Sequence, residues 1–199
     1  ILGLTMLLAL FQLLQAKETR QIQLRGKLLT LAGIPLHIGK PMPNISLPDL
    51  SLNLVSIGSL KGKVTIISVV PSLDTAVCEK QTHILSERNN GLDKKARLIT
   101  ISRDLPFAQN RFTREAKIGN LIYLSDYREG RFGLETGLLI DENRLLARAI
   151  IILDAKGIVR YLEIVPNLEQ LPRRKKRSRL PDLCSKYQPV LFSYITFQP

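Results

Sequence analysis

Two adjoining stretches decide the fold: VTIISVV at residues 64–70, and directly after it PSLDTAVC at residues 71–78. The first is a β-branched and largely apolar run of strand length, bounded by Gly62 and Pro71. A strand of this composition has to be covered on both faces. The run therefore predicts a central strand in an α/β sheet.

A helix is expected to begin shortly after this strand, because residues 76–89 follow a helical pattern. Thr75 or Asp74 can cap that helix by accepting a backbone N–H. Cys78 then lies in the first turn, where unpaired N–H groups and the helix dipole favour the thiolate, the nucleophilic form of the side chain. The alternative interpretation is a buried and inert cysteine, because cysteine is often fully buried.

The remaining periodic segments alternate between strand and helix and end in a hairpin. Strands are expected at residues 96–102, 121–124, 147–154 and 158–164, helices at 106–116 and 131–136, and an amino-terminal hairpin at 21–24 and 28–31 around Gly26. Residues 38–49 contain three prolines and are expected to be an extended connection. This order predicts an α/β protein with a mixed central sheet flanked by helices and an N-terminal β-hairpin, compatible with a thioredoxin-like fold.

The length and charge of the chain favour one folded domain with a basic end. A chain of 199 residues with 45% hydrophobic residues can bury one sizeable core. The formal net charge is +12, and half of it comes from the run RRKKRSR at residues 173–179. Such concentration argues against a broad nucleic-acid-binding surface, so no specific nucleic acid partner is expected. The run itself could contact polyanions, or it could simply be solvated.

The first sixteen residues are uncharged and mostly aliphatic, and the composition turns polar at Lys17. This resembles the apolar region of a secretory signal peptide, and it is short for a membrane span, which needs about 20 residues. The alternative is an amphipathic or buried amino-terminal helix. We therefore expect an apolar leader at 1–16, one domain at 17–171 and an irregular basic tail at 172–199. A functional leader predicts an exported or periplasmic protein; otherwise the protein is cytoplasmic.

Neither the cysteines nor the histidines are spaced like metal ligands. Cys78 and Cys184 lie far apart in the sequence, which fits neither a disulfide scaffold nor a zinc site. His37 and His83 are the only histidines. No metal site is therefore expected.

Three segments carry a resemblance to a known family. PSLDTAVC places Pro71, Thr75 and Cys78 in the PxxxTxxC pattern of the peroxiredoxin active site. RDLPFAQNRF at residues 103–112 is similar to a segment typical of the thiol peroxidase subfamily, and LLARAIIILD resembles the strand that brings the family's active-site arginine. The similarity covers about residues 22–166. The chain is identified as a member of the thiol peroxidases, in the peroxiredoxin superfamily.

The resemblance implies a mechanism residue by residue. The Cys78 thiolate would attack a peroxide oxygen and become a sulfenic acid, while water or an alcohol leaves. Arg148 would hold the thiolate charged and donate to the peroxide, Thr75 would orient the peroxide, and Pro71 would shield the sulfur from water. Without the resemblance, Arg148 would be interpreted as an exposed arginine at a strand edge. The implied function is a thiol-dependent, antioxidant peroxidase acting on hydrogen peroxide and organic hydroperoxides, and the implied mechanism needs no cofactor.

The sequence departs from the family at the resolving cysteine. In the family a cysteine commonly follows the RF pair, and here the residue after Phe112 is Thr113. Either an external reductant, thioredoxin or another thiol, reduces the sulfenic acid, or Cys184 replaces the missing partner. We favour the external thiol, because Cys184 lies outside the region of resemblance. The alternative function is a redox-sensing or binding protein with poor turnover. The resemblance also suggests a homodimer.

Overall fold

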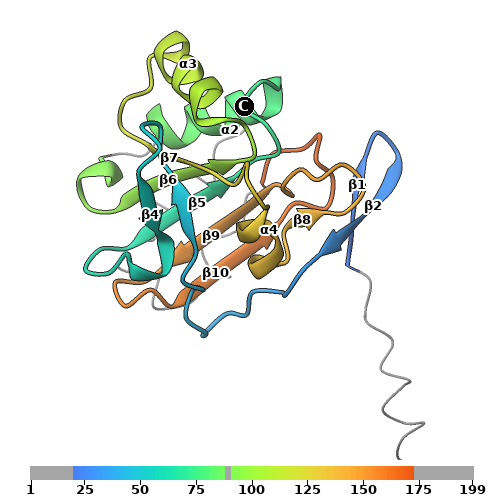
Figure 1. The fold of residues 1–199 in the computed structure, drawn as a ribbon, viewed down its shortest axis with the longest axis horizontal. Coiled ribbons are helices and arrows are strands. Elements are labelled where there is room, and N and C mark those ends of the chain that lie inside the picture. The colour runs from blue at the N-terminus through green and yellow to red at the C-terminus, as the bar shows by residue number, and fades with distance from the viewer. Residues whose placement is uncertain (1–19, 88–90, 173–199) are drawn as a thin grey trace, which may run out of the picture.

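The computed structural model describes residues 20–87 and 91–172, so the predictions made for the leader and for most of the basic tail lie outside the described residues. Its centre is a five-stranded mixed sheet in the order β10-β9-β5-β6-β7 (Figure 1). The strands are β5 (Thr65–Val69), β6 (Arg97–Ser102), β7 (Ile122–Ser125), β9 (Ala149–Leu153) and β10 (Val159–Ile164). β5 is parallel to β6 and antiparallel to β9. The predicted central strand and the mixed α/β sheet are confirmed.

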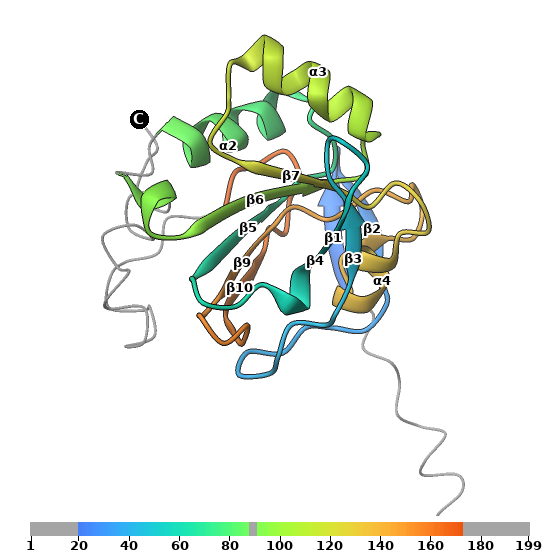
Figure 2. The ribbon, with the colours of Figure 1, turned by 60° about the vertical axis from the view of Figure 1, so that its left-hand side comes forward.

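Two helices cover one face of this sheet. They are α2 (Ala76–Glu87) and α3 (Pro106–Ala116), which lie together on one side of the strands in Figure 2. Leu85 of α2 and Phe112 of α3 pack into a buried cluster with the sheet residues Ile66 and Val70. Pro106 is at the start of α3 as predicted, because its missing N–H would have no partner in a first turn.

The other face is covered by short strands and a short helix. These are the hairpin β1 (Gln21–Leu24) and β2 (Lys27–Ala32), the strand β8 (Leu139–Ile140) that pairs with β2, and α4 (Arg131–Thr136). Phe132 of α4 belongs to one buried cluster with Ile67 and Val69 of β5, and these two residues alternate with Ile66 and with Val70, which directly follows the strand. The two faces of β5 thus belong to two separate hydrophobic clusters, as its composition predicts.

The structure differs from the sequence-based expectation in the connection at residues 38–49. This segment contains β3 (Ser46–Pro48), which pairs antiparallel with β4 (Leu54–Ser56). The turn between them is held by Asp49, whose side chain accepts hydrogen bonds from the N–H groups of Ser51 at 2.8 Å and Asn53 at 2.9 Å. Strands of three residues have too little alternation to be detected among prolines.

Several predicted bounds are close to the observed ones. α3 and α4 begin and end where they were expected, and β6 and β10 differ by one residue at their starts. In the β1–β2 hairpin, Arg25 and Gly26 both have positive φ, at 50° and 76°, as a tight two-residue turn requires. Within residues 20–87 and 91–172, no helix combines the length and the apolarity needed to cross a membrane.

Candidate active site

Cys78 is the third residue of α2 and therefore lies in its first turn, as predicted. Its side chain belongs to the cluster between α2 and the sheet, and the residue is 0% exposed. One turn further on, the Thr82 hydroxyl donates a hydrogen bond to the Cys78 carbonyl at 2.8 Å. The sulfur is thus enclosed by protein at the amino-terminal end of the helix.

The sheet brings Arg148 to the same end of the molecule. β5 and β9 are antiparallel, and their last register pair is Val69 with Ala149. Arg148 comes just before Ala149, so it lies where β5 leads into the loop before α2. Side chains alternate along a strand, and Ile150 contributes to the cluster on the α2 face. Arg148 therefore points to that face. The alternative of an exposed edge arginine is wrong, because Arg148 is 2% exposed.

The Arg148 guanidinium contacts the Cys78 sulfur directly. Its Nη2 donates to Sγ at 3.4 Å and to the Leu168 carbonyl at 2.9 Å. Nε donates to the same carbonyl at 3.2 Å, and Nη1 donates to Oε1 of Gln81 at 2.7 Å. No carboxylate of the described residues forms an ion pair with this buried guanidinium. A buried cation needs compensation, and a thiolate at Cys78 would supply it.

The loop at residues 71–75 is held by Asp104. The two carboxylate oxygens of Asp104 accept from the Ser72 hydroxyl and from the Leu73 N–H, both at 2.7 Å. Pro71 is buried at the end of β5. The loop therefore leaves the central strand and enters α2 in a defined conformation.

Thr75 directly precedes the first residue of α2 and is exposed. Its hydroxyl donates to the Ser72 carbonyl at 3.1 Å. The expectation that a side chain at this position accepts a helix N–H is not met by Thr75, since the loop turns its hydroxyl back toward Ser72. The structure thus brings Cys78 and Arg148 into contact, and places Pro71 and Thr75 in the adjoining loop.

Comparisons with known proteins show which family the chain belongs to. The sequence model of the redoxin family matches residues 37–178, which is more than half of the chain. The chain belongs to the redoxin family. Curated relatives include a thiol peroxidase of Listeria innocua, 40% identical over 73% of this chain and 88% of its own length. A thiol peroxidase of Staphylococcus aureus is 40% identical over 76% of this chain and 92% of its own length.

Solved structures support the same assignment. A peroxiredoxin-like protein from Aquifex aeolicus superposes with a TM-score of 0.75 at 33% identity, covering 86% of this chain and 97% of its own. A thiol peroxidase from Chromobacterium violaceum gives a TM-score of 0.66 at 26% identity, covering 76% of this chain and 89% of its own. The predicted resemblance to thiol peroxidases and the predicted thioredoxin-like fold are confirmed.

In this redoxin, the position after Phe112 carries no thiol. The hydroxyl of Thr113 donates to the Asn110 carbonyl at 2.8 Å on α3. Cys78 is a free cysteine, and Cys184 lies outside the described residues. Among the residues that the structure describes, no three His, Cys, Asp or Glu side chains are grouped as a metal site would require.

Some residues at the redoxin site were missed from the sequence. Gln81 follows Cys78 by three positions on α2, and this spacing places both on one side of a helix, which could have indicated it. Ser68, which binds Gln81, is a polar residue in an otherwise apolar face of β5. Leu168 contributes only its backbone carbonyl. A backbone contribution leaves no signal in the side-chain pattern.

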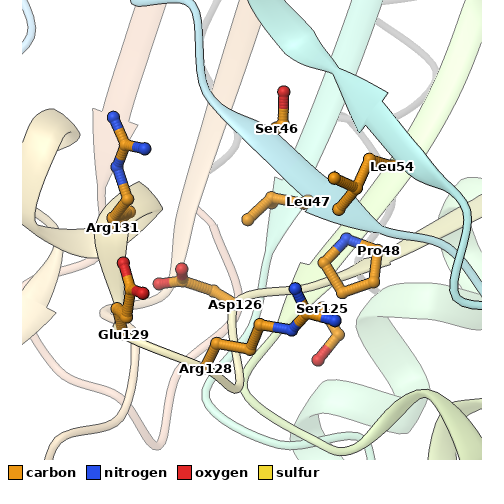
Figure 3. Close-up of a pocket in the computed structure, with 9 residues that line it drawn as sticks. All are labelled: Ser46, Leu47, Pro48, Leu54, Ser125, Asp126, Arg128, Glu129 and Arg131. Atoms are coloured by element: carbon orange, nitrogen blue, oxygen red, sulfur yellow. The ribbon is translucent and has the colours of Figure 1, made fainter.

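A hollow of about 200 Å³ lies apart from the sulfur, between the β3–β4 hairpin and the segment that joins β7 to α4 (Figure 3). It is lined by Ser46, Leu47, Pro48, Leu54, Ser125, Asp126, Arg128, Glu129 and Arg131. Neither Cys78 nor Arg148 lines it. Burial raises the pKa of Asp126, while N–H groups of Phe132 and Gly133, each at 3.0 Å from its carboxylate, act in the opposite direction. Asp126 therefore serves to hold the start of α4.

Proposed function

We propose that this chain is a thiol-dependent peroxidase that reduces hydrogen peroxide and organic hydroperoxides through Cys78. The observation that carries the proposal is the 3.4 Å contact between Arg148 Nη2 and Cys78 Sγ at the start of α2. The thiol peroxidase relatives imply a peroxide substrate and a thiol reductant. They also favour an enzyme over the redox-sensing alternative.

The first chemical step is an in-line displacement at oxygen. The Cys78 thiolate forms an S–O bond with one peroxide oxygen as the O–O bond breaks. Sulfur is oxidised by two electrons to sulfenic acid, and the departing oxygen takes a proton to leave as water or alcohol. A thiol then condenses with the sulfenic acid to a mixed disulfide and water, and a second thiol displaces Cys78 as a thiolate.

Arg148 supplies positive charge at the reacting atoms. A guanidinium stays protonated and presents five N–H donors in one plane. The contacts of Arg148 to Leu168, Gln81 and Cys78 use four of these donors. The fifth, the second N–H of Nη1, has no hydrogen-bond partner among the described residues. We propose that it donates to a peroxide oxygen. Charge developing on the departing oxygen would be stabilised by a donor that is already in place.

Thr75 and Pro71 complete the proposed site from the loop before the helix. The Thr75 hydroxyl donates to Ser72, which leaves its lone pairs able to accept from a peroxide O–H. This contact would align the O–O bond with the sulfur. Pro71 is buried next to the strand end, which supports its proposed role in keeping water from the thiolate.

Reduction of the sulfenic acid is proposed to use an external thiol, thioredoxin or a small dithiol. The hydroxyl of Thr113 cannot form a disulfide, and Cys184 lies outside the region of family resemblance. Because Cys78 is 0% exposed, a thiol on a partner protein reaches the sulfur only after the loop at residues 71–75 and the first turn of α2 have opened. Equal recycling of Cys184→Ser and the parent would support the external thiol, and slower recycling of the variant would contradict it.

Three proposals concern the whole chain and rest on family resemblance or composition. A homodimer is proposed from the resemblance, and analytical ultracentrifugation would test it. Residues 1–16 are proposed as an export leader, and 172–199 as a contact for polyanions. The latter predicts binding to heparin that falls steeply with salt and is lost when 172–199 are deleted.

The decisive experiment is peroxide consumption with a dithiol as the reductant. The parent is expected to consume peroxide catalytically, and Cys78→Ser is expected to be inactive. Equal rates for the two proteins would refute the proposal. Stable sulfenic acid at Cys78 that thioredoxin and small dithiols fail to reduce would instead favour the redox-sensing alternative.

A further inference from the structure

Gln81 lies between Arg148, which contacts Cys78, and Ser68 of the central strand β5. It is 1% exposed and follows Cys78 by three positions on α2. Its Oε1 accepts from Nη1 of Arg148 at 2.7 Å, and its Nε2 donates to the hydroxyl of Ser68 at 2.7 Å. The chain of contacts therefore runs from β5 through Gln81 and Arg148 to the sulfur.

The orientation of the Gln81 amide follows from this chain of contacts. A guanidinium has donors and no acceptor, so only the amide oxygen can face Arg148. The amide nitrogen must then face Ser68, whose hydroxyl oxygen can accept its hydrogen bond. A side chain held at both ends while buried has one conformation in which both bonds are made. Because Ser68 belongs to β5, Gln81 holds the Arg148 guanidinium in a fixed position relative to that strand.

Arg148 is held from two sides in its own plane. The Leu168 carbonyl accepts from Nε and Nη2, and Gln81 accepts from Nη1. Two acceptors on different edges fix the rotation of the guanidinium plane as well as its position. This orientation directs Nη2 at the sulfur, and one N–H of Nη1 has no partner within residues 20–87 and 91–172.

Both acceptors are uncharged. A carboxylate in place of Gln81 would form an ion pair with Arg148 and neutralise part of its charge, and less would remain for the thiolate. A neutral amide holds the guanidinium without this loss. The choice of an amide at this position therefore matches the chemistry proposed for Cys78.

We propose that Gln81 is a positioning residue of the peroxidase reaction, which acts through Arg148 and is itself held by Ser68. The inference rests on the proposed function of Cys78 and deepens it. Gln81 does not touch the reacting atoms. Its effect is to keep the positive charge and the donors of Arg148 directed at the sulfur and the peroxide.

The test compares Gln81→Leu and Gln81→Glu with a matched control, Gln109→Leu. Gln109 is also a buried glutamine, and it bonds to Ser102 and to the Leu124 carbonyl, away from Arg148. Two quantities are measured for each variant. One is the rate constant for oxidation of Cys78 by hydrogen peroxide, and the other is the pH dependence of Cys78 alkylation by uncharged iodoacetamide.

Gln81→Leu is expected to slow oxidation by about 10- to 100-fold, since a charged donor loses its hydrogen-bond partner, and to move the alkylation profile to higher pH. Gln81→Glu keeps an acceptor but adds charge, so the same shift is expected, with the oxidation rate recovering at high pH. Gln109→Leu is expected to match the parent in both measurements. An unchanged oxidation rate in Gln81→Leu, or slower oxidation without a shift in the alkylation profile, would overturn the proposal.

Ser68→Ala provides a second, milder test that does not alter α2. It removes the acceptor for Gln81 and is expected to give the same two changes at smaller size. Parent-like behaviour in both measurements would contradict the role given to Ser68.

Peroxide consumption by the parent distinguishes a failure of the proposed function from a failure of the role given to Gln81. If the parent consumes no peroxide, or if Cys78→Ser consumes it equally fast, the proposed function fails. If the parent behaves as proposed and Gln81→Leu matches it, only the role of Gln81 fails.

Discussion

Arg148 Nη2 lies 3.4 Å from Cys78 Sγ, although 70 positions separate the two residues in the chain. The contact depends on the antiparallel pairing of β9 with β5, which places the start of one strand beside the end of the other. It joins the positive charge of a buried guanidinium to the amino-terminal end of α2. Two independent sources of positive potential thus act on one sulfur.

Replacement of Arg148 tests the guanidinium in this contact. Arg148→Lys keeps the charge but loses the planar set of donors that reaches Leu168, Gln81 and Cys78 together. Oxidation of Cys78 by peroxide is expected to slow by about 100- to 1000-fold, as measured by stopped-flow kinetics. Arg160→Lys, which alters an arginine paired with Asp154, serves as the control. Parent-like kinetics in Arg148→Lys would contradict the role of the guanidinium.

Substitutions of Thr75 are expected to change peroxide reduction without changing the stability of the fold. Thr75→Val removes the hydroxyl while keeping a branched side chain, so peroxide reduction is expected to fall by about tenfold or more, within the range for a lost positioning contact. Because Thr75 is exposed, the free energy of unfolding is expected to change by less than about 1 kcal/mol. Thr75→Ser retains the hydroxyl and should keep most of the activity. Equal activity in the valine and serine variants would exclude a role for the hydroxyl.

Much of the fold could be predicted because its central elements have strong periodic patterns. β5 was found from its apolar run, α3 from Pro106 and its helical spacing, and the β9–β10 hairpin from two strand-like runs around a glycine turn. The β3–β4 pair was missed, because strands of three residues have almost no periodic signal. Its pairing is held by a turn at Asp49 that the sequence pattern did not reveal.

The site was predicted only as far as motif residues extend. Family motifs identify four site residues: Pro71, Thr75, Cys78 and Arg148. Position in the sequence alone does not decide whether Cys78 is a nucleophile or an inert buried cysteine, and it favours an exposed Arg148. Gln81 and Asp104 were missed, since their roles depend on contacts across the sheet and between loops. Such contacts are set by register and loop geometry, which a single sequence does not specify.

The hydrogen bonds between the Asp104 carboxylate and the loop before α2 are expected to control access to the Cys78 sulfur. Asp104→Ala removes acceptors for Ser72 and Leu73. The free energy of unfolding is expected to fall by about 1–3 kcal/mol. Cys78 is also expected to react faster with a bulky aromatic disulfide reagent, because the loop opens more often. Unchanged reagent kinetics despite the lower stability would show that opening does not pass through this loop.

Asp154 lies in the β9–β10 turn, away from Cys78 and Arg148, and its carboxylate is expected to make the stability of the fold depend on pH. Burial by itself would raise the pKa of Asp154, but hydrogen bonds from the Ile158 N–H, the Arg160 guanidinium and the Lys156 N–H outweigh it, and the pKa is lowered. The ionised carboxylate therefore stabilises the folded state above its ordinary pKa of 3.8, and this contribution is lost as the pH falls through the lowered value.

Asp154→Asn is thus expected to reduce the free energy of unfolding at neutral pH by about 1–3 kcal/mol. The difference from the parent should shrink below about pH 4, where the carboxylate becomes protonated. Urea denaturation at a series of pH values measures the free energy of unfolding of the parent and of Asp154→Asn. A difference that stays constant down to strongly acidic pH would show that the carboxylate charge is not the stabilising feature.

Oxidation of Cys78 is tested most directly by mass spectrometry of the intact protein after one equivalent of hydrogen peroxide, followed by mapping of the oxidised peptide. We expect that one oxygen is added at Cys78, that a thiol reductant removes it, and that Arg148→Lys takes it up far more slowly. Consumption of peroxide while the Cys78 peptide stays unmodified, with the oxygen found on another residue, would contradict this expectation.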